Sequence, residues 1–288
     1  MSPRLKKPTW LRRRLPTDPA FEKVRRLIGD GHLHTVCQEA KCPNIWECFS
    51  RQTATFLILG DRCSRNCRFC AVAHGPKGPP DSSEPAAVAD AVLRMNLDYV
   101  VITSVTRDDL SDGGAGHFAK TIAAVRQKKP LAGIEVLIPD FQGNQSALSA
   151  ILAAEPNVVN HNMETVRRLY PEVRPQADYD RSLAVIETLS QAAPAIPVKS
   201  GLMVGLGETK DELVETFENL IDAGCRFLTI GQYLQPSRSH LDVQRYLPPE
   251  EFDELKSLAL SLGFTHVASG PFVRSSYHAK DMFQKAPP

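Results

Sequence analysis

From residue 56 onward, short apolar segments alternate with amphipathic segments. The apolar segments are rich in β-branched residues and carry apolar side chains on both faces, which is typical of strands buried inside a parallel sheet. Residues 17–55, by contrast, show no sustained helical or strand period. The apolar segments predict strands at residues 56–60, 99–105, 134–139, 157–160, 197–205 and 227–231.

The segments between these strands have the spacing of helices that bury one face. In the stretch 209–224, Leu213 and Phe217 fall on one side, Thr209 suits the N-cap, and Gly224 suits the end of the helix. Residues 144–156, 179–192 and 249–263 show similar patterns. Six strand–helix units in succession favour a partial parallel β/α barrel over a doubly wound sheet.

Polar residues gather where the predicted strands end. In a β/α barrel the carboxyl ends of the strands form the mouth that carries the active site. Lys199 is expected to leave the fifth strand at this mouth. The other strand-end residues are Thr103, Ser104, Asp140, residues 160–164 and Gln232.

Six of the seven cysteines lie between residues 37 and 70. A disulfide framework would suit a small secreted chain. The N-terminus has no apolar signal core, and no run of about 18 apolar residues predicts a membrane span. We therefore expect a cytoplasmic protein whose thiolates bind metal. The net charge of +1 gives no global field that would attract nucleic acid or a membrane.

Cys63, Cys67 and Cys70 form a C-x3-C-x2-C motif. Thiolates select zinc, copper(I) or iron–sulfur clusters, and structural zinc sites have four ligands. Three cysteines favour a four-iron cluster with one iron left open for a substrate. His74 is a candidate fourth ligand, so a zinc site remains an alternative at this point.

The C-x3-C-x-aromatic-C pattern, with Phe69 as the aromatic residue, resembles the radical S-adenosylmethionine (SAM) superfamily. The resemblance implies that the open iron binds the amino and carboxylate groups of SAM. An electron from the cluster then cleaves SAM to methionine and a 5′-deoxyadenosyl radical.

The second triad, Cys37, Cys42 and Cys48, has C-x4-C-x5-C spacing and resembles the lipoyl synthase family. The Arg-Ser-Ser-Tyr sequence at 274–277 agrees, as do the segments "SVTRDDLSDGGAGHF", "NHNMET" and "KSGLMVGLGE". The resemblance covers residues 30 to 280 approximately. It implies two 4Fe–4S clusters, the second held by this triad and Ser276. Cys225 is the alternative fourth ligand, although it is expected to be buried at a strand start.

The implied reaction is the insertion of two sulfur atoms into an octanoyl chain on a carrier-protein lysine. Radicals remove hydrogens at carbons six and eight, and the auxiliary cluster supplies the sulfur. The implied partners are octanoylated lipoyl carrier domains, an electron donor such as flavodoxin or ferredoxin, and an iron–sulfur cluster carrier.

The resemblance also implies contacts with SAM. Gly113 and Gly114 match the glycine-rich stretch that contacts the methionyl amine, and Arg174 suits either a carboxylate partner or an exposed surface position. Lys199 is a weaker candidate. Asn160, Asn162 and Glu164 are candidates because they form a polar run at the end of the fourth predicted strand, and Glu164 suits the cationic or hydroxyl parts of SAM.

Three parts of the chain are expected on this interpretation. Residues 1–55 form a basic arm and an auxiliary-cluster extension, 56–250 form the partial barrel, and 251–288 form a helix and a tail that closes over the mouth. The basic arm is either solvated or attracts an acidic partner. Its basic residues are Arg4, Lys6, Lys7, Arg12, Arg13 and Arg14.

Two rival functions remain open from the residues. One is a different radical SAM enzyme whose second cluster relays electrons. The other is a zinc-stabilised protein that uses its basic arm to bind nucleic acid.

Metal analysis of anaerobically purified protein separates these functions. Two triads predict about eight irons per chain, in two four-iron clusters. Replacing the 63/67/70 triad with alanine should halve the iron and abolish SAM cleavage, whereas replacing the 37/42/48 triad should stop only sulfur transfer. Zinc in place of iron, or SAM cleavage by the first variant, would contradict the assignment.

Overall fold

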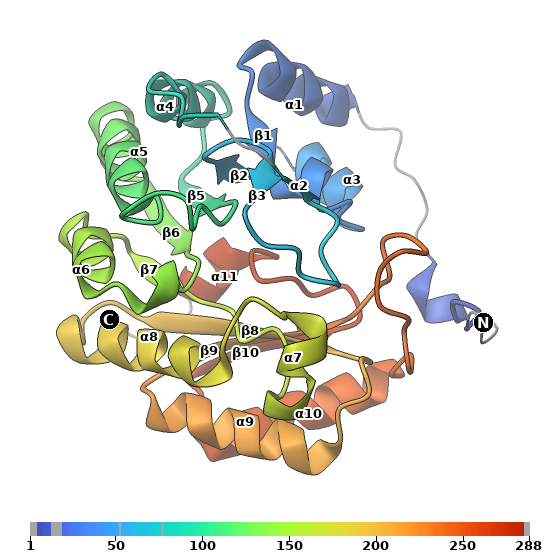
Figure 1. The fold of residues 1–288 in the computed structure, drawn as a ribbon. Helices are drawn as coiled ribbons and strands as arrows, with labels where there is room; N and C mark the ends of the chain where they lie inside the picture. The colour runs from blue at the N-terminus through green and yellow to red at the C-terminus, as the bar shows by residue number, and fades with distance from the viewer. Residues whose placement is uncertain (1–4, 13–18, 52, 76–77, 285–288) are drawn as a thin grey trace. The chain divides into compact units, whose positions relative to one another are not determined.

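The structure is a computed structural model that describes residues 5–12, 19–51, 53–75 and 78–284 (Figure 1). The chain divides into two compact units. The N-terminal unit contains Leu15–Arg65 and Ala71–Val159, and the C-terminal unit contains Met1–Arg14, Asn66–Cys70 and Asn160–Pro288. Cys63 therefore belongs to the N-terminal unit, whereas Cys67 and Cys70 belong to the C-terminal unit.

The N-terminal unit is built on a sheet with the strand order β1-β2-β5-β6-β7. β1 pairs with β2 in the antiparallel sense, while β2, β5 and β6 are parallel. The short strands β3 and β4 pair separately and set Cys63 opposite His74. The strands are β1 (His34–Thr35), β2 (Thr55–Ile58), β3 (Arg62–Cys63), β4 (Ala73–His74), β5 (Tyr99–Ser104), β6 (Gly133–Leu137) and β7 (Val158–Asn160).

Helices α4, α5 and α6 of this unit pack side by side in sequence order (Figure 1). Each presents apolar residues on one face, such as Val88 of α4 and Phe118 of α5. The helical segments are α1 (Pro19–Asp30), α2 (Val36–Glu39), α3 (Ile45–Ser50), α4 (Glu84–Arg94), α5 (Ala115–Lys128), η2 (Phe141–Gly143) and α6 (Gln145–Ala153).

Helix α1 corrects the expectation that residues 17–55 lack a sustained period. It buries Phe21, Val24 and Ile28 on one face. The Phe21 ring stacks on Trp46 of α3, with 4.3 Å between the ring centroids. The apolar stripe is narrow and lies among charged residues, which explains why its period was missed.

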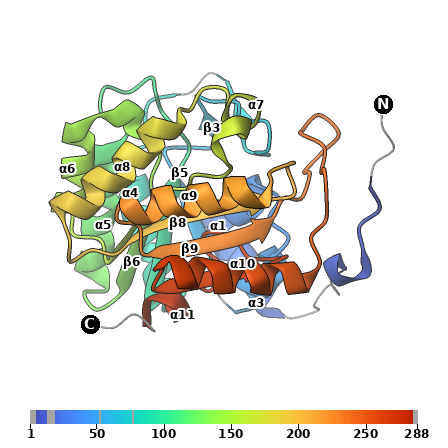
Figure 2. The same ribbon diagram turned by 90° about the horizontal axis from the view of Figure 1, so that it is seen from below.

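The C-terminal unit contains the parallel strands β8, β9 and β10 in that order. Helices α8, α9 and α10 lie along the strands (Figure 2). The elements are η1 (Thr9–Leu11), η3 (Arg167–Leu169), α7 (Tyr170–Val173), α8 (Tyr179–Ala192), β8 (Val198–Val204), α9 (Lys210–Asp222), β9 (Phe227–Gln232), α10 (Pro249–Leu262), β10 (His266–Gly270) and α11 (Ala279–Gln284).

All six predicted strands are present, as β2, β5, β6, β7, β8 and β9. β10 is an additional parallel strand that was not predicted. Its sequence, HVASG, has one apolar residue larger than alanine and is mostly half-buried, so it lacks the continuous apolar run of the other strands.

Helix α9 has the ends that its sequence predicts. Its N-cap, Thr209, accepts a hydrogen bond from the Glu212 N–H, and the Glu212 carboxylate accepts one from the Thr209 N–H, which forms a capping box. After the helix, Gly224 has a φ of +87°, a conformation that glycine adopts without strain.

The described part of the basic arm exposes Lys6, Lys7 and Arg12 around η1. Arg4, Arg13 and Arg14 lie outside the described residues. Among the described helices, none is both long enough and apolar enough to cross a membrane.

Replacing Thr209 with alanine should lower the free energy of unfolding by about 1 kcal/mol, because the N-cap hydrogen bond is lost. Thr209→Ser keeps the hydroxyl and should cost less. Urea denaturation of both variants measures the difference, and equal losses would show that the cap does not stabilise the helix.

Glu212 should make stability depend on pH. Hydrogen bonds from Arg168, followed by the Thr209 N–H, lower the pKa of Glu212 from 4.5 to about 2. A carboxylate with a depressed pKa stabilises the fold above its unfolded pKa and loses that effect as pH falls through its folded pKa. The difference in unfolding free energy between the native chain and Glu212→Gln should therefore shrink below about pH 4.5. A difference that stays constant down to about pH 2 would contradict this.

Candidate active site

The triad of Cys37, Cys42 and Cys48 is gathered within the N-terminal unit. Cys37 lies in α2, Cys48 lies in α3, and Cys42 lies in the turn between them. The pKa of the Cys37 thiol is held well above its ordinary value by a hydrogen bond with Cys48, then by burial and by the nearby Cys42 and Cys48. Three thiols so close together would repel one another as thiolates unless a cationic centre compensated their charge.

Backbone hydrogen bonds shape the segment that carries this triad. The Cys42 N–H donates to the Cys37 carbonyl at 3.1 Å, and the Ile45 N–H donates to the Cys42 carbonyl at 3.3 Å. The Cys48 carbonyl accepts from both the N–H and the hydroxyl of Thr53. The triad segment is thus ordered by successive turns and two short helices.

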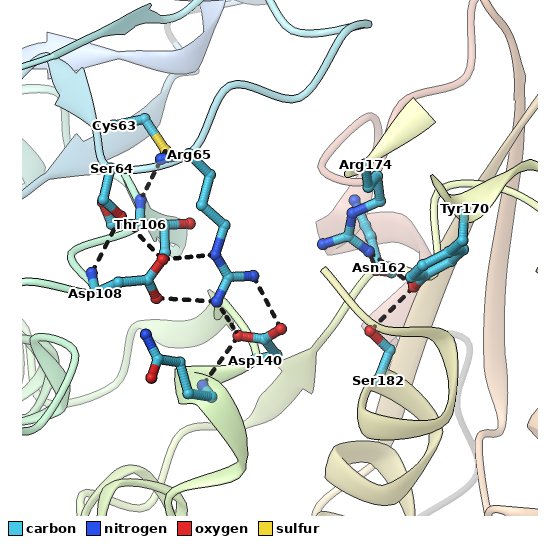
Figure 3. Close-up of polar contacts among 11 residues, drawn as sticks. Cys63, Ser64, Arg65, Thr106, Asp108, Asp140, Asn162, Tyr170, Arg174 and Ser182 are labelled. Carbon is cyan, nitrogen blue, oxygen red and sulfur yellow. Dashed lines mark hydrogen bonds and ion pairs between the residues drawn. The ribbon is translucent and has the colours of Figure 1, made fainter. Parts of the chain in front are cut away.

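Cys63, the first cysteine of the other triad, ends β3 in the N-terminal unit. Its Sγ accepts hydrogen bonds from the N–H groups of Arg65 at 3.4 Å and Thr106 at 3.3 Å (Figure 3). Hydrogen bonds to cysteine sulfurs are among the contacts that tune iron–sulfur clusters, so this environment suits a cluster ligand.

Cys67 and Cys70 lie in a tight turn of the C-terminal unit, where the Cys70 N–H donates to the Cys67 carbonyl at 3.0 Å. Arg68 fixes the turn by donating its N–H to the Val173 carbonyl and accepting the Leu241 N–H. The ring of His240 bonds the Cys70 carbonyl at 2.9 Å. Phe69, which lies between Cys67 and Cys70 in the sequence, is half-buried. Nothing in the sequence around His240 signalled this contact.

Asn162, Glu164 and Arg174 come together in the C-terminal unit. Arg174 is buried, and its Nη1 donates to the Asn162 carbonyl at 3.0 Å and to the Tyr170 hydroxyl at 2.9 Å (Figure 3). The alternative of a surface arginine is therefore wrong. The Asn162 amide donates to Glu164 Oε1 at 3.0 Å.

Burial raises the pKa of Glu164, and the charges of Arg174 and Arg274 together with the hydrogen bond from Asn162 oppose this rise. Glu164 also has a φ of +68°, which is uncommon outside glycine. Strained positions of this kind cluster at functional sites.

Two asparagines of this group carry buried polar atoms without hydrogen bonds. Asn160 is fully buried, and within the described residues neither its Oδ1 nor its Nδ2 has a partner. The Oδ1 of Asn162 also lacks a partner there. Buried polar atoms are normally paired, so these atoms have capacity for the polar groups of a ligand.

The C-terminal tail reaches this group through Ser275, whose Oγ accepts from the Asn162 amide at 2.7 Å. The tail crosses Gly231 of β9, where an added Cβ would lie 2.1 Å from the Val273 carbonyl oxygen. Ser276 follows, half-buried, and its carbonyl accepts the Ala279 N–H at 3.4 Å. The C-terminal tail therefore lies against β9 and Asn162 within the C-terminal unit, and its closure over the barrel mouth stays a prediction.

Gly113 and Gly114 lie at the start of α5 in the N-terminal unit with φ values of +60° and +94°. The Gly114 N–H donates to Asp112 Oδ1 at 2.9 Å, and the Gly113 N–H donates to the Leu110 carbonyl. The loop therefore requires these glycines for its own conformation, and their contact with SAM stays a prediction.

Lys199 corrects an expectation about position. It is the second residue of β8 and is fully buried, whereas it was expected to leave the strand. The apolar run 197–205 continues to the real end of β8 at Val204, so Lys199 lies at the start of the strand. Cys225 is fully buried as expected, and burial raises the pKa of its thiol to about 12.

Residues 57–220 match the model of the Radical SAM superfamily. The lipoyl synthase of Desulfotalea psychrophila is 57% identical over 283 residues, which cover 98% of this chain and 95% of that protein. The lipoyl synthase of Caldicellulosiruptor saccharolyticus is 55% identical over 276 residues, or 96% of this chain and 97% of that protein. The chain belongs to the lipoyl synthase family.

Solved structures support the fold of this family member. HydG, a maturase of the FeFe hydrogenase, matches with a TM-score of 0.58 at 13% identity, over 79% of this chain and 61% of that chain. Methylornithine synthase (PylB) matches with a TM-score of 0.50 at 14% identity, over 87% and 82% of the two chains. These matches confirm the partial β/α barrel as the fold class.

The residues present fit the cofactors of the lipoyl synthase family, which are SAM and two 4Fe–4S clusters. Three features suit ligands of that chemistry: the gathered thiols of Cys37, Cys42 and Cys48, the N–H donors on Cys63, and the unpaired polar atoms of Asn160 and Asn162. Among the described residues, no three His, Cys, Asp or Glu side chains are grouped as a single metal ion would require.

Gly114→Ala should destabilise the chain by more than about 1 kcal/mol, because a positive φ strains any residue with a Cβ. The added Cβ would also lie 2.3 Å from Leu59 Cδ1. Gly29→Ala is the matched control, since Gly29 lies in α1, an added Cβ there would meet nothing within 4 Å, and alanine favours a helix. Thermal unfolding measures the midpoints of both variants. Equal midpoints would show that Gly114→Ala introduces no strain.

Proposed function

We propose that the protein inserts two sulfur atoms at carbons six and eight of an octanoyl group attached to a lysine of a carrier domain. The observation that carries this proposal is the identity of 57% to a lipoyl synthase over 98% of the chain. Identity at this level across nearly the full length of both proteins supports the same activity.

Each triad would hold one cluster. Cys63, Cys67 and Cys70 would bind the cluster that holds SAM. Cys37, Cys42 and Cys48, together with Ser276, would bind the auxiliary cluster. When bound, these cofactors supply the radical and the sulfur, while the protein supplies position and exclusion of water.

The group around Asn162 is suited to binding SAM. Glu164 and Asn162 offer oxygen acceptors to the amino and hydroxyl groups of SAM, and the unpaired amide of Asn160 offers both a donor and an acceptor. Arg174 donates a hydrogen bond to the Asn162 carbonyl and so holds the backbone of Asn162 in place. Gly113, Gly114 and Phe69 remain proposed contacts, and Lys199 is the weakest of them because it is buried at a strand start.

Several partners follow from this reaction. The substrates are octanoylated lipoyl carrier domains, the reductant is a flavodoxin or ferredoxin, and an iron–sulfur cluster carrier rebuilds the auxiliary cluster. We place the reaction in the cytoplasm, where thiols stay reduced. We also retain the proposed division into an N-terminal extension to residue 55, a barrel to residue 250 and a C-terminal tail.

Ser276 is the proposed fourth ligand of the auxiliary cluster. Cys225 is its rival, but Cys225 is fully buried beside β8 and β9, and its sulfur donates to the Phe227 carbonyl at 3.3 Å. A serine oxygen is a harder ligand than a thiolate and binds soft iron less well. An iron held in this way would be released more readily when the cluster gives up sulfur.

The proposed function is tested by incubating the reconstituted protein with an octanoylated carrier domain, SAM and a reductant. Mass spectrometry of the carrier should show the addition of two sulfur atoms per octanoyl group. A carrier that stays unmodified while SAM is cleaved would favour the alternative in which the second cluster relays electrons.

Ser276→Ala should still cleave SAM, and sulfur insertion should fall sharply or stop after the first sulfur, because the auxiliary cluster has lost a ligand. Ser275→Ala should be milder and is the matched control. Normal turnover by Ser276→Ala, together with loss of the auxiliary cluster in Cys225→Ala, would identify Cys225 as the ligand instead.

A further inference from the structure

Arg65 lies inside the C-x3-C loop, and its side chain is only 3% exposed. It donates to Asp108 through Nε at 2.7 Å and through Nη2 at 2.9 Å. It also donates to Asp140 through Nη1 at 2.9 Å and through Nη2 at 2.5 Å (Figure 3). One guanidinium thus bonds two carboxylates, each through two nitrogens.

The two carboxylates come from different strands of the N-terminal unit. Asp108 follows β5, and Asp140, which is fully buried, follows β6. Arg65 therefore ties the cysteine loop to the ends of two neighbouring strands. A guanidinium suits this role because its planar fork of donors matches paired carboxylates, whereas the ammonium of lysine is a point charge.

The same contacts fix the surroundings of the Cys63 sulfur. Both N–H donors to Sγ, those of Arg65 and Thr106, belong to the clamped segments. Ser64 reinforces the arrangement, since its N–H and hydroxyl both donate to the Thr106 carbonyl, and its Oγ accepts the Asp108 N–H at 3.1 Å.

We propose that Arg65 is a positioning residue that holds the Cys63 sulfur beneath two backbone N–H donors and so sets the reduction potential and the retention of the cluster that Cys63 binds. This inference rests on the proposed function, in which Cys63 is a cluster ligand. Hydrogen bonds to cluster sulfurs tune the potential. By drawing negative charge from the thiolate, they favour the reduced cluster and raise its potential.

The experiment compares two lysine substitutions in the full-length reconstituted protein. Arg65→Lys keeps the charge and removes the fork. Arg107→Lys is the matched control, because the Arg107 side chain is also 3% exposed and bonds Asp109 and the carbonyls of Leu59 and Gly78. Arg107 thus shares the burial and the type of contact and lies in the same loop as Thr106, but its guanidinium bonds Asp109 and two carbonyls in place of Asp108 and Asp140.

Two readouts are independent of sulfur insertion. The first is the midpoint potential of the cluster whose electron paramagnetic resonance signal changes when SAM is added. The second is the rate of iron loss to a chelator. Arg65→Lys should lower the potential and speed iron loss by about 10-fold, as loss of a supporting contact does at other metal sites. Arg107→Lys should leave both unchanged.

An unchanged potential in Arg65→Lys would overturn the proposal, as would an equal shift in Arg107→Lys. Cys63→Ala separates this failure from failure of the proposed function. If Cys63→Ala retains all of its iron, Cys63 is not a ligand and the premise is wrong. If it loses one cluster while Arg65→Lys behaves as the native chain does, only the positioning role is wrong.

Discussion

The parallel pairing of neighbouring strands is the constraint on which the candidate site depends. A parallel ladder brings the carboxyl ends of its strands to one edge, so the loops that follow leave together. In the N-terminal unit Thr103 of β5 pairs with Leu137 of β6, and the loops beyond them place Asp108 and Asp140 within reach of one arginine. In the C-terminal unit the register of β8 with β9 sets Gly201 opposite Thr229. A side chain at Gly201 would collide with Asn162 and Thr229, so the glycine leaves the space that Asn162 occupies.

Features that depend on a few consecutive residues could be predicted from the sequence. The six strands are continuous apolar runs, and their burial on both faces explains why the runs are unbroken. Thr209 and Gly224 bound α9 because capping is decided within one turn of the helix. Both cysteine triads are local as well, so the spacing alone indicated soft-metal chemistry.

Features that depend on distant partners left no such signal. Arg65 looks like any basic residue in a loop until the fold brings Asp108 and Asp140 to it, 43 and 75 residues away in the chain. The contact between Ser275 and Asn162 spans 113 residues and was equally invisible. β10 was missed because its pairing with β9 orders a segment that is poor in apolar residues. Lys199 was misplaced because an apolar run shows that a strand exists without showing which end of the strand a polar residue occupies.

Because Cys225 is buried, its thiol can serve as a probe of local unfolding in the C-terminal unit. The thiol is enclosed beside β8 and β9, and its pKa of about 12 keeps it protonated at neutral pH. Alkylating reagents attack the thiolate, so Cys225 is protected both by exclusion of the reagent and by its protonation. Modification of Cys225 would therefore report how often these strands separate, and the rate of labelling would measure the free energy of that opening in the intact chain.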